Sequence, residues 1–239
     1  MYRIVENLSE ATAVILVGGM GTRLRIVVSD RPKALAEIHG RPFLAYLLDQ
    51  LGDVGIKSVV LCTGYMGDQV QVTFGDAYAG MRLVYSKETS PLGTAGALRL
   101  ALPLFQSDPV LVMNGDSICR ADFRVFWQWH RAHDAQGTVL LTQMPDTLRY
   151  GRVQLNEAGM VTGFDEKGKT GPGWINAGIY ALTRALIEAV PRDRAVSLEH
   201  DMFPLWIGNG LYGYRCYTEF LDIGTPESYS RVAEFLAQG

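Results

Sequence analysis

Apolar runs of strand length alternate with amphipathic stretches from residue 12 to about residue 145. Such alternation is typical of βαβ units and predicts an α/β fold with a mostly parallel sheet. Phe43, Leu47 and Leu51 fall on one face of a predicted helix, and Pro42 suits its first turn. In this half we predict strands at 12–17, 57–62, 81–85, 109–113 and 138–143, and helices at 42–54, 93–104 and 122–135.

The pattern changes after about residue 145. Two short alternating segments, 152–155 and 160–164, flank a turn that ends at Gly159 and predict a hairpin. The chain has 239 residues and no proline-rich linker, so we predict one domain whose second half is a subdomain on a continuous sheet. Beyond the hairpin we predict strands at 175–182 and 212–217 and helices at about 184–189, 198–207 and 226–237.

Three glycines, Gly18, Gly19 and Gly21, follow the first predicted strand. Glycine allows a close approach of the backbone to a ligand and leaves N–H groups free to bind an anion. The Walker motif does not fit, because Gly-Lys-Ser/Thr is missing, and the dinucleotide fingerprint Gly-x-Gly-x-x-Gly is not completed. Arg23 and Lys33 supply cations for a polyphosphate, so a phosphate loop is favoured over an ordinary strand-to-helix turn.

The composition limits which kinds of partner and which location we expect. A formal charge of −3 and a pI near 5.8 argue against binding to nucleic acid or an anionic membrane, which needs a basic excess. Cys62, Cys119 and Cys216 are too scattered for a disulfide framework, which fits a reducing cytosol. The sequence has neither a signal peptide's apolar core nor the run of about 18 apolar residues of a transmembrane helix, so we expect a cytoplasmic protein.

Two aspartates follow apolar, strand-like segments. Asp116 comes directly after the predicted strand 109–113, and Asp222 follows Phe220 and Leu221. The alternative is a plain turn, for which the residues around Asp116 are well suited. Because the carboxyl ends of parallel strands meet at one edge of a sheet, both carboxylates should lie beside the glycine loop. Two carboxylates suffice for Mg²⁺, so we predict a Mg²⁺ site there.

Other loops place polar groups beside glycines. The segment 88–96 opens a helix with small residues, against which a flat base fits; a helix start rich in small residues is the alternative. Glu166 suits sugar hydroxyls and Lys167 a sugar phosphate, although an exposed hairpin turn has the same composition.

The histidines and cysteines suggest no separate chemistry. His130 and His133 have a spacing that can share a metal, but without a third nearby ligand we predict a half-exposed helix face. Nothing near Cys119 would lower its pKa, so we predict a packing role rather than a nucleophile.

In this order, the motifs resemble those of the sugar-1-phosphate nucleotidylyltransferases, and the resemblance covers nearly the whole chain. It implies a Rossmann-like three-layer sandwich with a small β-rich sugar-binding subdomain. The implied parts are nucleotide-binding at about 12–145, sugar-phosphate-binding at about 146–225, and a C-terminal helix at 226–237. The matching motifs are Gly-Gly-x-Gly-Thr-Arg-Leu at 18–24, Pro-Lys at 32–33, Leu-Gly-Thr-Ala-Gly at 92–96, Gly-Asp-Ser at 115–117, Tyr-Gly at 150–151, Glu-Lys at 166–167, Asn-Ala-Gly at 176–178 and Asp-Ile-Gly-Thr-Pro at 222–226.

The resemblance also implies roles for single residues. Arg23 would bind the β- and γ-phosphates, Lys33 would lie by the α-phosphate, and Asp116 and Asp222 would hold Mg²⁺. The implied catalytic residues are Arg23, Lys33, Asp116 and Lys167. The implied nucleotide-binding residues are Leu16, Gly18, Gly19, Gly21, Thr22, Arg23, Lys33, Glu88, Leu92, Gly93, Thr94, Ala95, Asn114 and Asp116. The implied sugar-phosphate-binding residues are Tyr150, Gly151, Glu166, Lys167, Asn176 and Gly178.

Within the family, segments 21–25, 28–35, 42–47 and 197–199 are most similar to the D-glycero-D-manno-heptose 1-phosphate guanylyltransferases. That similarity implies transfer of a nucleotidyl group from GTP to heptose 1-phosphate, giving GDP-heptose and pyrophosphate. A phosphate oxygen attacks the α-phosphorus, and no general base is needed because a phosphate monoester is already a dianion near neutral pH.

Several alternatives stay open. The substrate can instead be mannose, glucose or N-acetylmuramate 1-phosphate, with GTP or UTP. A regulatory module that binds sugar nucleotides without chemistry should lack the loop cation or the carboxylates, whereas Arg23 and Asp222 are present. A glycosyltransferase usually shows Asp-x-Asp, whereas Asp116 stands alone. The oligomeric state is open, with a homodimer as one option.

Overall fold

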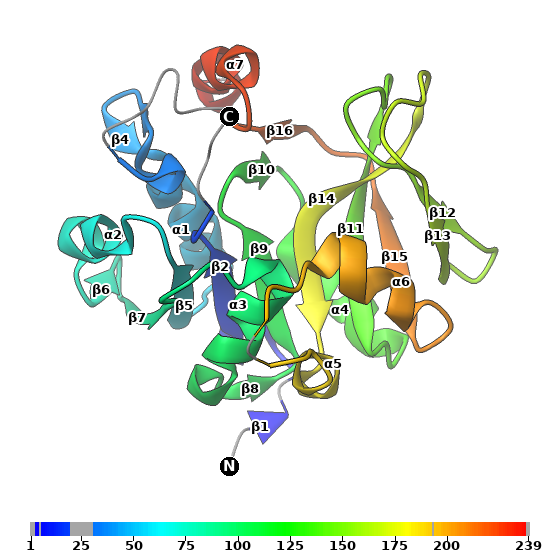
Figure 1. Cartoon of the computed structure of the whole chain (residues 1–239), viewed down its shortest axis with the longest axis horizontal. Helices are drawn as coiled ribbons and strands as arrows, with labels where there is room; N and C mark the ends of the chain where they lie inside the picture. Colours follow the sequence, from blue (N-terminus) through cyan, green and yellow to red (C-terminus); the bar gives the residue numbers. More distant parts are fainter. Residues whose placement is uncertain (1–2, 5, 20–30, 193, 238–239) are drawn as a thin grey trace.

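One eight-stranded sheet forms the centre of the computed structural model, which describes residues 3–4, 6–19, 31–192 and 194–237. Its strands are β2 (Thr12–Leu16), β5 (Ser58–Thr63), β6 (Ala77–Tyr78), β7 (Met81–Lys87), β9 (Val110–Asn114), β11 (Gly137–Met144), β14 (Gly173–Leu182) and β15 (Leu211–Cys216). They lie in the order β15-β11-β14-β9-β2-β5-β7-β6 (Figure 1). Only β14 and β6 run antiparallel to their neighbours, so the sheet is mostly parallel, as predicted.

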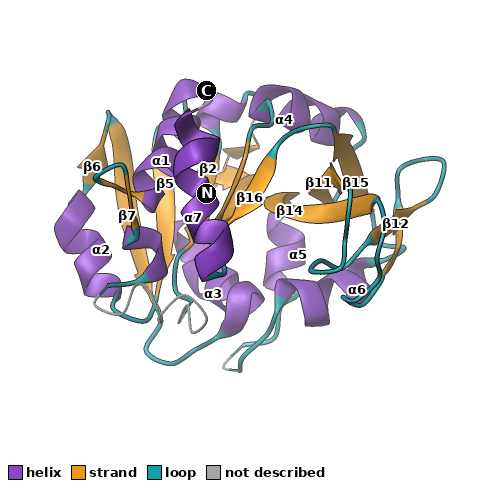
Figure 2. Ribbon diagram, turned by 90° about the horizontal axis from the view of Figure 1, so that it is seen from above, coloured by secondary structure: helices purple, strands orange, loops and turns teal. Residues whose placement is uncertain are grey.

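Helices cover both faces of this sheet (Figure 2). Residues of β2 explain why, because Ala13 and Ile15 join one hydrophobic cluster and Val14 joins the other. Each face of a buried parallel strand needs an apolar cover, so three layers result. On the Ile15 side pack α1 (Phe43–Asp53), α4 (Phe123–Ala132) and α7 (Pro226–Ala237), and on the Val14 side pack α3 (Gly93–Ala101), α5 (Arg184–Glu188) and α6 (Phe203–Trp206). The predicted three-layer α/β fold is confirmed.

Short elements complete the chain. A hairpin of β12 (Val153–Leu155) and β13 (Val161–Phe164) projects beside the sheet, where a hairpin was predicted. The predicted helix at 198–207 instead begins as a π-helical turn, η5 (Leu198–Met202), and continues as α6. The others are β1 (Arg3–Ile4), η1 (Leu8–Glu10), η3 (Lys33–Leu35), β3 (Glu37–Ile38), β4 (Arg41–Pro42), α2 (Gly67–Phe74), η4 (Leu102–Leu104), β8 (Ser107–Asp108), β10 (Ser117–Cys119) and β16 (Phe220–Asp222).

Two kinds of element were not predicted from the sequence patterns. In α2, Val70, Val72 and Phe74 alternate with polar residues, which mimics a strand, and Val72 is 86% exposed. The strands β10 and β16 have three residues each, too few to show a period of two. They pair antiparallel, with Ser117 opposite Asp222. This pairing joins the end of β9 to the segment before α7.

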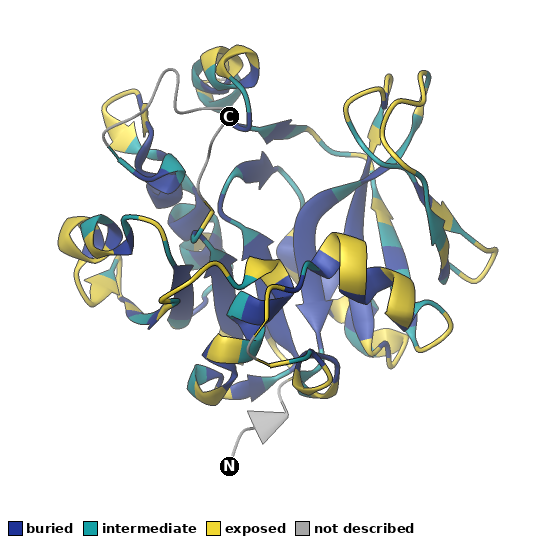
Figure 3. Cartoon of the chain, in the orientation of Figure 1, coloured by how far each residue is buried: buried dark blue, intermediate teal, exposed yellow. Residues whose placement is uncertain are grey.

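The core lies on both faces of the central strands (Figure 3). Within the described residues, no helix is long and apolar enough to cross a membrane. All three cysteines are free thiols. Burial raises the pKa of the Cys119 thiol to about 12, which agrees with the predicted packing role.

His130 differs from its predicted half-exposed position, since it is 1% exposed while His133 is exposed and stacks on Trp129. The His130 Nδ1 atom lies 2.8 Å from the Thr138 hydroxyl. Burial, and then the charge of Arg131, lowers the pKa of His130 from 6.5 to about 4.

This burial should make stability depend on pH. The unfolded chain takes up the His130 proton near pH 6.5 and the folded chain only near pH 4, so acidification favours unfolding. Lowering the pH from about 7.5 to about 5 should cost about 2 kcal/mol of unfolding free energy through this residue. His130→Gln cannot titrate and should lose about 2 kcal/mol less over this range in urea unfolding. Equal pH slopes for the two proteins would contradict the assignment.

Candidate active site

A cleft of about 430 Å³ opens at the carboxyl ends of the parallel strands. Three of its walls follow strands β2, β7 and β9, and two others come from the start of α3 and from the segment before η5. Its lining includes Leu16, Gly18, Gly19, Glu88, Gly93, Thr94, Asn114 and Asp116 of the predicted nucleotide-binding set, together with Cys62, Pro91, Ala97, Ser197 and Glu199.

The glycine loop begins in this cleft. A Cβ on Gly18 would lie 3.1 Å from the Glu88 carboxylate and 3.3 Å from the backbone nitrogen of Gly64, so the backbones approach closely there. Gly19 faces open space, with nothing within 4 Å of an added Cβ. The predicted residues Gly21, Thr22 and Arg23 lie outside the described residues.

Glu88 forms a polar wall of the cleft beside this loop. Its Oε2 atom accepts a hydrogen bond of 3.0 Å from the backbone N–H of Leu92, at the start of α3. Burial raises the pKa of the Glu88 carboxyl, although this hydrogen bond works in the opposite direction. A carboxylate therefore faces the space between the glycine loop and α3.

Lys33 and Asp116 meet at the edge of the cleft. The Lys33 ammonium lies 2.7 Å from Asp116 Oδ2, with the lysine side chain 12% exposed and the aspartate 50% exposed. Gly115 makes this placement possible, because its N–H donates to the carbonyl of Leu16 and an added Cβ would lie 2.6 Å from that oxygen. The turn after β9 thus lies closely enough against the end of β2 to place Asp116 beside the glycine loop.

Asp222 lies beside Asp116 on the paired strand β16. The N–H of Ile223 donates to the Asp116 carbonyl at 2.8 Å, which joins the two backbones directly. One Asp222 oxygen accepts from the Tyr150 hydroxyl at 2.7 Å, and the other accepts from the N–H of Gly224 at 2.8 Å. Burial works to raise the Asp222 pKa, but these donors and the nearby Arg149 and Lys33 hold it below its ordinary value.

The two carboxylates fit a hard divalent cation. Among the described residues, no three side chains of His, Cys, Asp or Glu converge as a metal-binding group, but Mg²⁺ usually takes only one or two protein carboxylates. Asp116, in the turn before β10, and Asp222, on the paired strand β16, would supply oxygen ligands at the cleft edge.

On the other side of Asp116, a hydrogen-bonded cluster reaches from β14 to η5. The Asn176 side-chain amide donates to the Tyr180 hydroxyl at 3.0 Å and to Glu199 at 3.2 Å. Glu199 lines the cleft. Desolvation by the surrounding protein, and to a smaller extent the charge of Asp116, raises the pKa of its carboxyl, while the charges of Lys167 and His200 lower it. Asn176 and Lys167, both predicted to bind the sugar phosphate, therefore lie near one carboxylate.

Gly151 joins the remaining predicted sugar residues. A Cβ on Gly151 would lie 2.7 Å from the Asp165 carbonyl, and the Asp165 N–H donates to the carbonyl of Arg152 at 2.8 Å. This close approach sets Tyr150, in the bend before β12, next to the loop that carries Glu166 and Lys167, both of which are exposed.

Some predicted residues have other surroundings. Ala95 is fully buried, and Leu92 lines a different hollow beside α3. Gly178 is buried with φ +73°, and a Cβ there would lie 2.8 Å from the Asn114 amide and 2.9 Å from the Ser117 hydroxyl. The absence of a side chain at Gly178 therefore leaves room for the Asn114 side chain.

The prediction of site residues omitted Ser197 and Glu199. Both line the cleft, and the Ser197 side chain caps η5 by accepting from the N–H of His200. A serine before a turn rich in acidic residues is an N-cap signal, but nothing local indicates that this turn faces the glycine loop.

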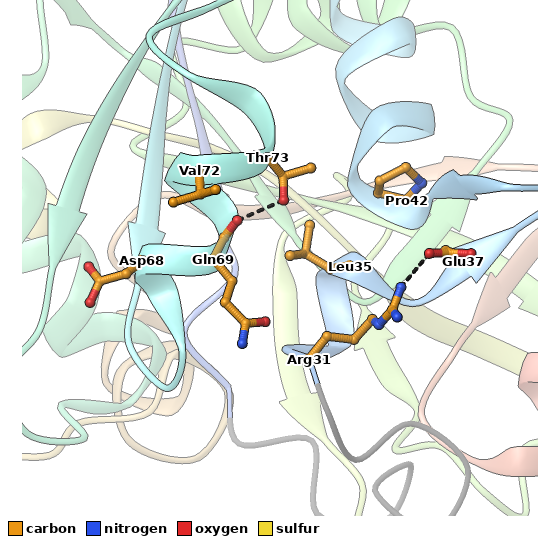
Figure 4. Close-up of a pocket in the computed structure, with 8 residues that line it drawn as sticks. All are labelled: Arg31, Leu35, Glu37, Pro42, Asp68, Gln69, Val72 and Thr73. Carbon is orange, nitrogen blue, oxygen red and sulfur yellow. Dashed lines mark hydrogen bonds and ion pairs between the residues drawn. The ribbon is translucent and has the colours of Figure 1, made fainter.

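A hollow of about 440 Å³ also lies between α2 and η3 (Figure 4). Its charged groups are already paired, since Arg31 bonds Glu37 on the same wall and Asp68 bonds Lys87. It contains none of the predicted site residues, so the cleft beside Asp116 is the candidate active site.

A parallel sheet that is covered by helices on both faces and has a cleft at its carboxyl edge is the architecture of nucleotide-binding α/β proteins. A family model described as "Nucleotidyl transferase" matches residues 12–239, and the chain belongs to this family.

Similar proteins extend along nearly all of the chain. It is 36% identical over 225 residues to a D-glycero-alpha-D-manno-heptose 1-phosphate guanylyltransferase from Aneurinibacillus thermoaerophilus, covering 94% of this chain and 97% of that protein. It is 36% identical over 235 residues to a mannose-1-phosphate guanylyltransferase from Mycobacterium tuberculosis, covering 96% and 66%. The crystal structure of HddC from Yersinia pseudotuberculosis complexed with GMP-PN matches with a TM-score of 0.85 and 32% identity, covering 95% and 99%.

Proposed function

We propose that this protein is a Mg²⁺-dependent sugar-1-phosphate guanylyltransferase that uses GTP and D-glycero-α-D-manno-heptose 1-phosphate. The observation that carries the proposal is the meeting of Lys33 and Asp116 at 2.7 Å beside the glycine loop, with Asp222 on the adjoining strand. Family membership and the heptose 1-phosphate guanylyltransferase relatives support it. The three free cysteines support a cytoplasmic location.

Glu88 supports guanine as the base. A carboxylate only accepts hydrogen bonds, and guanine presents a ring N–H and an exocyclic amino group side by side. Glu88 lies between Gly18 and the N–H of Leu92, at the wall where a base would stack on small residues. The similar HddC structure was solved with GMP-PN, which agrees with this choice.

The proposed reaction is an in-line displacement at phosphorus. A phosphate oxygen of the sugar 1-phosphate bonds to the α-phosphorus as the bond to the bridging oxygen of the β-phosphate breaks, and pyrophosphate leaves. Both reactants are anions, so the residues must hold like charges together and stabilise the leaving group. In this proposal Lys33 contacts the α-phosphate, and Lys167 with Asn176 holds the sugar phosphate. A Mg²⁺ ion bound by Asp116 and Asp222 would neutralise phosphate charge.

Mannose 1-phosphate is the second candidate acceptor, because a mannose-1-phosphate guanylyltransferase shows equal identity to this chain. A pyrophosphate-release assay of the four nucleoside triphosphates against heptose, mannose, glucose and N-acetylhexosamine 1-phosphates decides between them. We expect the highest kcat/KM for GTP with heptose 1-phosphate. An optimum at mannose 1-phosphate selects the second candidate, and release that depends on no sugar 1-phosphate would refute the enzyme assignment.

Tyr150 links the predicted sugar-phosphate residues to the proposed metal ligand Asp222, and this contact can be tested. Its hydroxyl donates to Asp222, so we expect it to orient this carboxylate rather than to bind sugar. Tyr150→Phe should raise the Mg²⁺ concentration for half-maximal activity by about 10- to 100-fold, as loss of a residue that orients a metal ligand does. The KM for the sugar 1-phosphate should change little.

Tyr46→Phe is the matched control, because it removes a hydroxyl that bonds the Ile38 carbonyl away from the cleft. It should leave both quantities unchanged. A Tyr150→Phe protein with a raised KM for sugar phosphate and an unchanged Mg²⁺ requirement would assign the hydroxyl to the sugar instead.

A further inference from the structure

A hollow of about 230 Å³ lies beside the cleft, on another face of α3. Three arginines line it, Arg99 from α3 and Arg192 and Arg194 from the segment before η5. Its apolar wall comes from Leu92, Leu100 and Pro191. Three cations therefore gather around one small concave surface in a chain whose formal charge is −3.

Several other arginines of the protein pair with carboxylates. Arg41 pairs with Asp49, and Arg184 pairs with Glu188. Within residues 31–192 and 194–237, by contrast, no carboxylate forms an ion pair with any of the three arginines of the hollow. The Nε atom of Arg99 is buried and has no hydrogen-bond partner. A buried donor without a partner and clustered like charges both disfavour the folded state, and an anion would relieve both.

We propose that this hollow is a second anion-binding site, which takes a diphosphate group. Guanidinium groups bind phosphate oxygens through pairs of N–H donors, and three of them match the charge of a diphosphate. Its volume is below the about 300 Å³ at which pockets begin to enclose whole drug-sized ligands. A small diphosphate group fits, with any attached nucleoside or sugar outside. The group can come from free pyrophosphate or from a sugar nucleotide.

The site shares both of its walls with the nucleotide cleft. On α3, Arg99 lines the hollow while Gly93 and Thr94 line the cleft. The opposite segment is bonded to this helix, because Val196 donates to the Leu92 carbonyl at 2.7 Å and the N–H of Leu198 donates to the Thr94 hydroxyl at 2.8 Å. An anion that bridges Arg99 to Arg192 and Arg194 would therefore hold together two walls of the cleft.

Titration calorimetry with inorganic pyrophosphate, without divalent cations, tests the proposal. The variant Arg192→Gln/Arg194→Gln should bind one pyrophosphate fewer per chain than the wild type, because two of its three charged donors are gone. The matched control Lys57→Gln/Arg82→Gln removes equal charge from exposed residues at the amino ends of β5 and β7, and it should keep the wild-type stoichiometry. Arg99→Gln should weaken the second site by about tenfold or more.

Three further measurements sharpen the outcome. Pyrophosphate should slow amide exchange at 195–198 in the wild type but not in Arg192→Gln/Arg194→Gln. GDP-mannose should be titrated in the same way. If it occupies the same site, sugar nucleotides are a source of the diphosphate group; if only pyrophosphate binds there, the ligand is the free anion. Orthophosphate that binds as tightly as pyrophosphate, or equal stoichiometry in both double variants, would overturn the proposal. The titration needs no turnover, so its result is independent of the proposed guanylyltransferase activity.

Discussion

Replacement of Asp116 by asparagine is expected to lower kcat/KM for pyrophosphate formation by about 10³-fold. Asparagine keeps the shape of the side chain but removes the charge that would bind a metal and that pairs with Lys33. The loss should fall mainly on kcat, because charge stabilisation matters most as the leaving group develops. Increasing Mg²⁺ should restore little activity.

The fold should survive this change, because Asp116 is half exposed and only one of its carboxylate oxygens forms a described ion pair. A melting temperature close to the wild-type value would separate the catalytic loss from unfolding. Asp134→Asn is the matched control, since Asp134 is exposed with φ +44°, a conformation that asparagine tolerates well. Asp116→Asn with more than about a tenth of the wild-type kcat/KM would remove Asp116 from the proposed metal site.

The second large effect is expected from Lys33→Met, which keeps most of the length and apolar stem of lysine but removes its charge. We expect kcat/KM for the nucleoside triphosphate to fall about 10²- to 10³-fold, in line with the loss of one donor that stabilises developing charge. The Lys33 side chain is only 12% exposed, so solvent or other cations cannot readily replace it. Steady-state kinetics of pyrophosphate release at saturating Mg²⁺ measures this loss.

Lys87→Met serves as the control, because Lys87 also forms an ion pair, with Asp68 at 2.6 Å on the exposed surface. An exposed pair contributes little, so this variant should keep wild-type kinetics and stability. Equal kinetics for Lys33→Met and the wild type would show that the ammonium group contacts no reacting phosphate.

The fold was predictable because its signals are local. The strands β2, β5 and β9 are short apolar runs that need burial on both faces, and α1 carries its apolar residues at helical spacing. The glycines after β2 predicted the position of the cleft for the same reason, because close approach of the backbone requires glycine and is therefore visible in a single residue type. The role of Arg23 in that loop stays a prediction.

The candidate site was only partly predictable. Both aspartates were predicted at the sheet edge, but Asp222 lies beside Asp116 through the antiparallel pair of β10 and β16 rather than at the end of a parallel strand, and these strands are too short to leave a pattern. Tyr150 was predicted to bind the sugar phosphate, which stays a prediction, and the hydrogen bond from its hydroxyl to Asp222 was not predicted. Glu199 reaches the cleft because η5 packs against α3, a contact between segments about one hundred residues apart in the chain.

The sequence by itself determined the three-layer α/β fold and the glycine loop, and its motif order indicated the family. Burial of apolar runs and backbone freedom at glycine are properties of neighbouring residues. Only the tertiary structure decided that Lys33 pairs with Asp116, that the Tyr150 hydroxyl donates to Asp222, and that three arginines line a second hollow. These contacts depend on strand register and helix packing between distant segments, which no local pattern specifies.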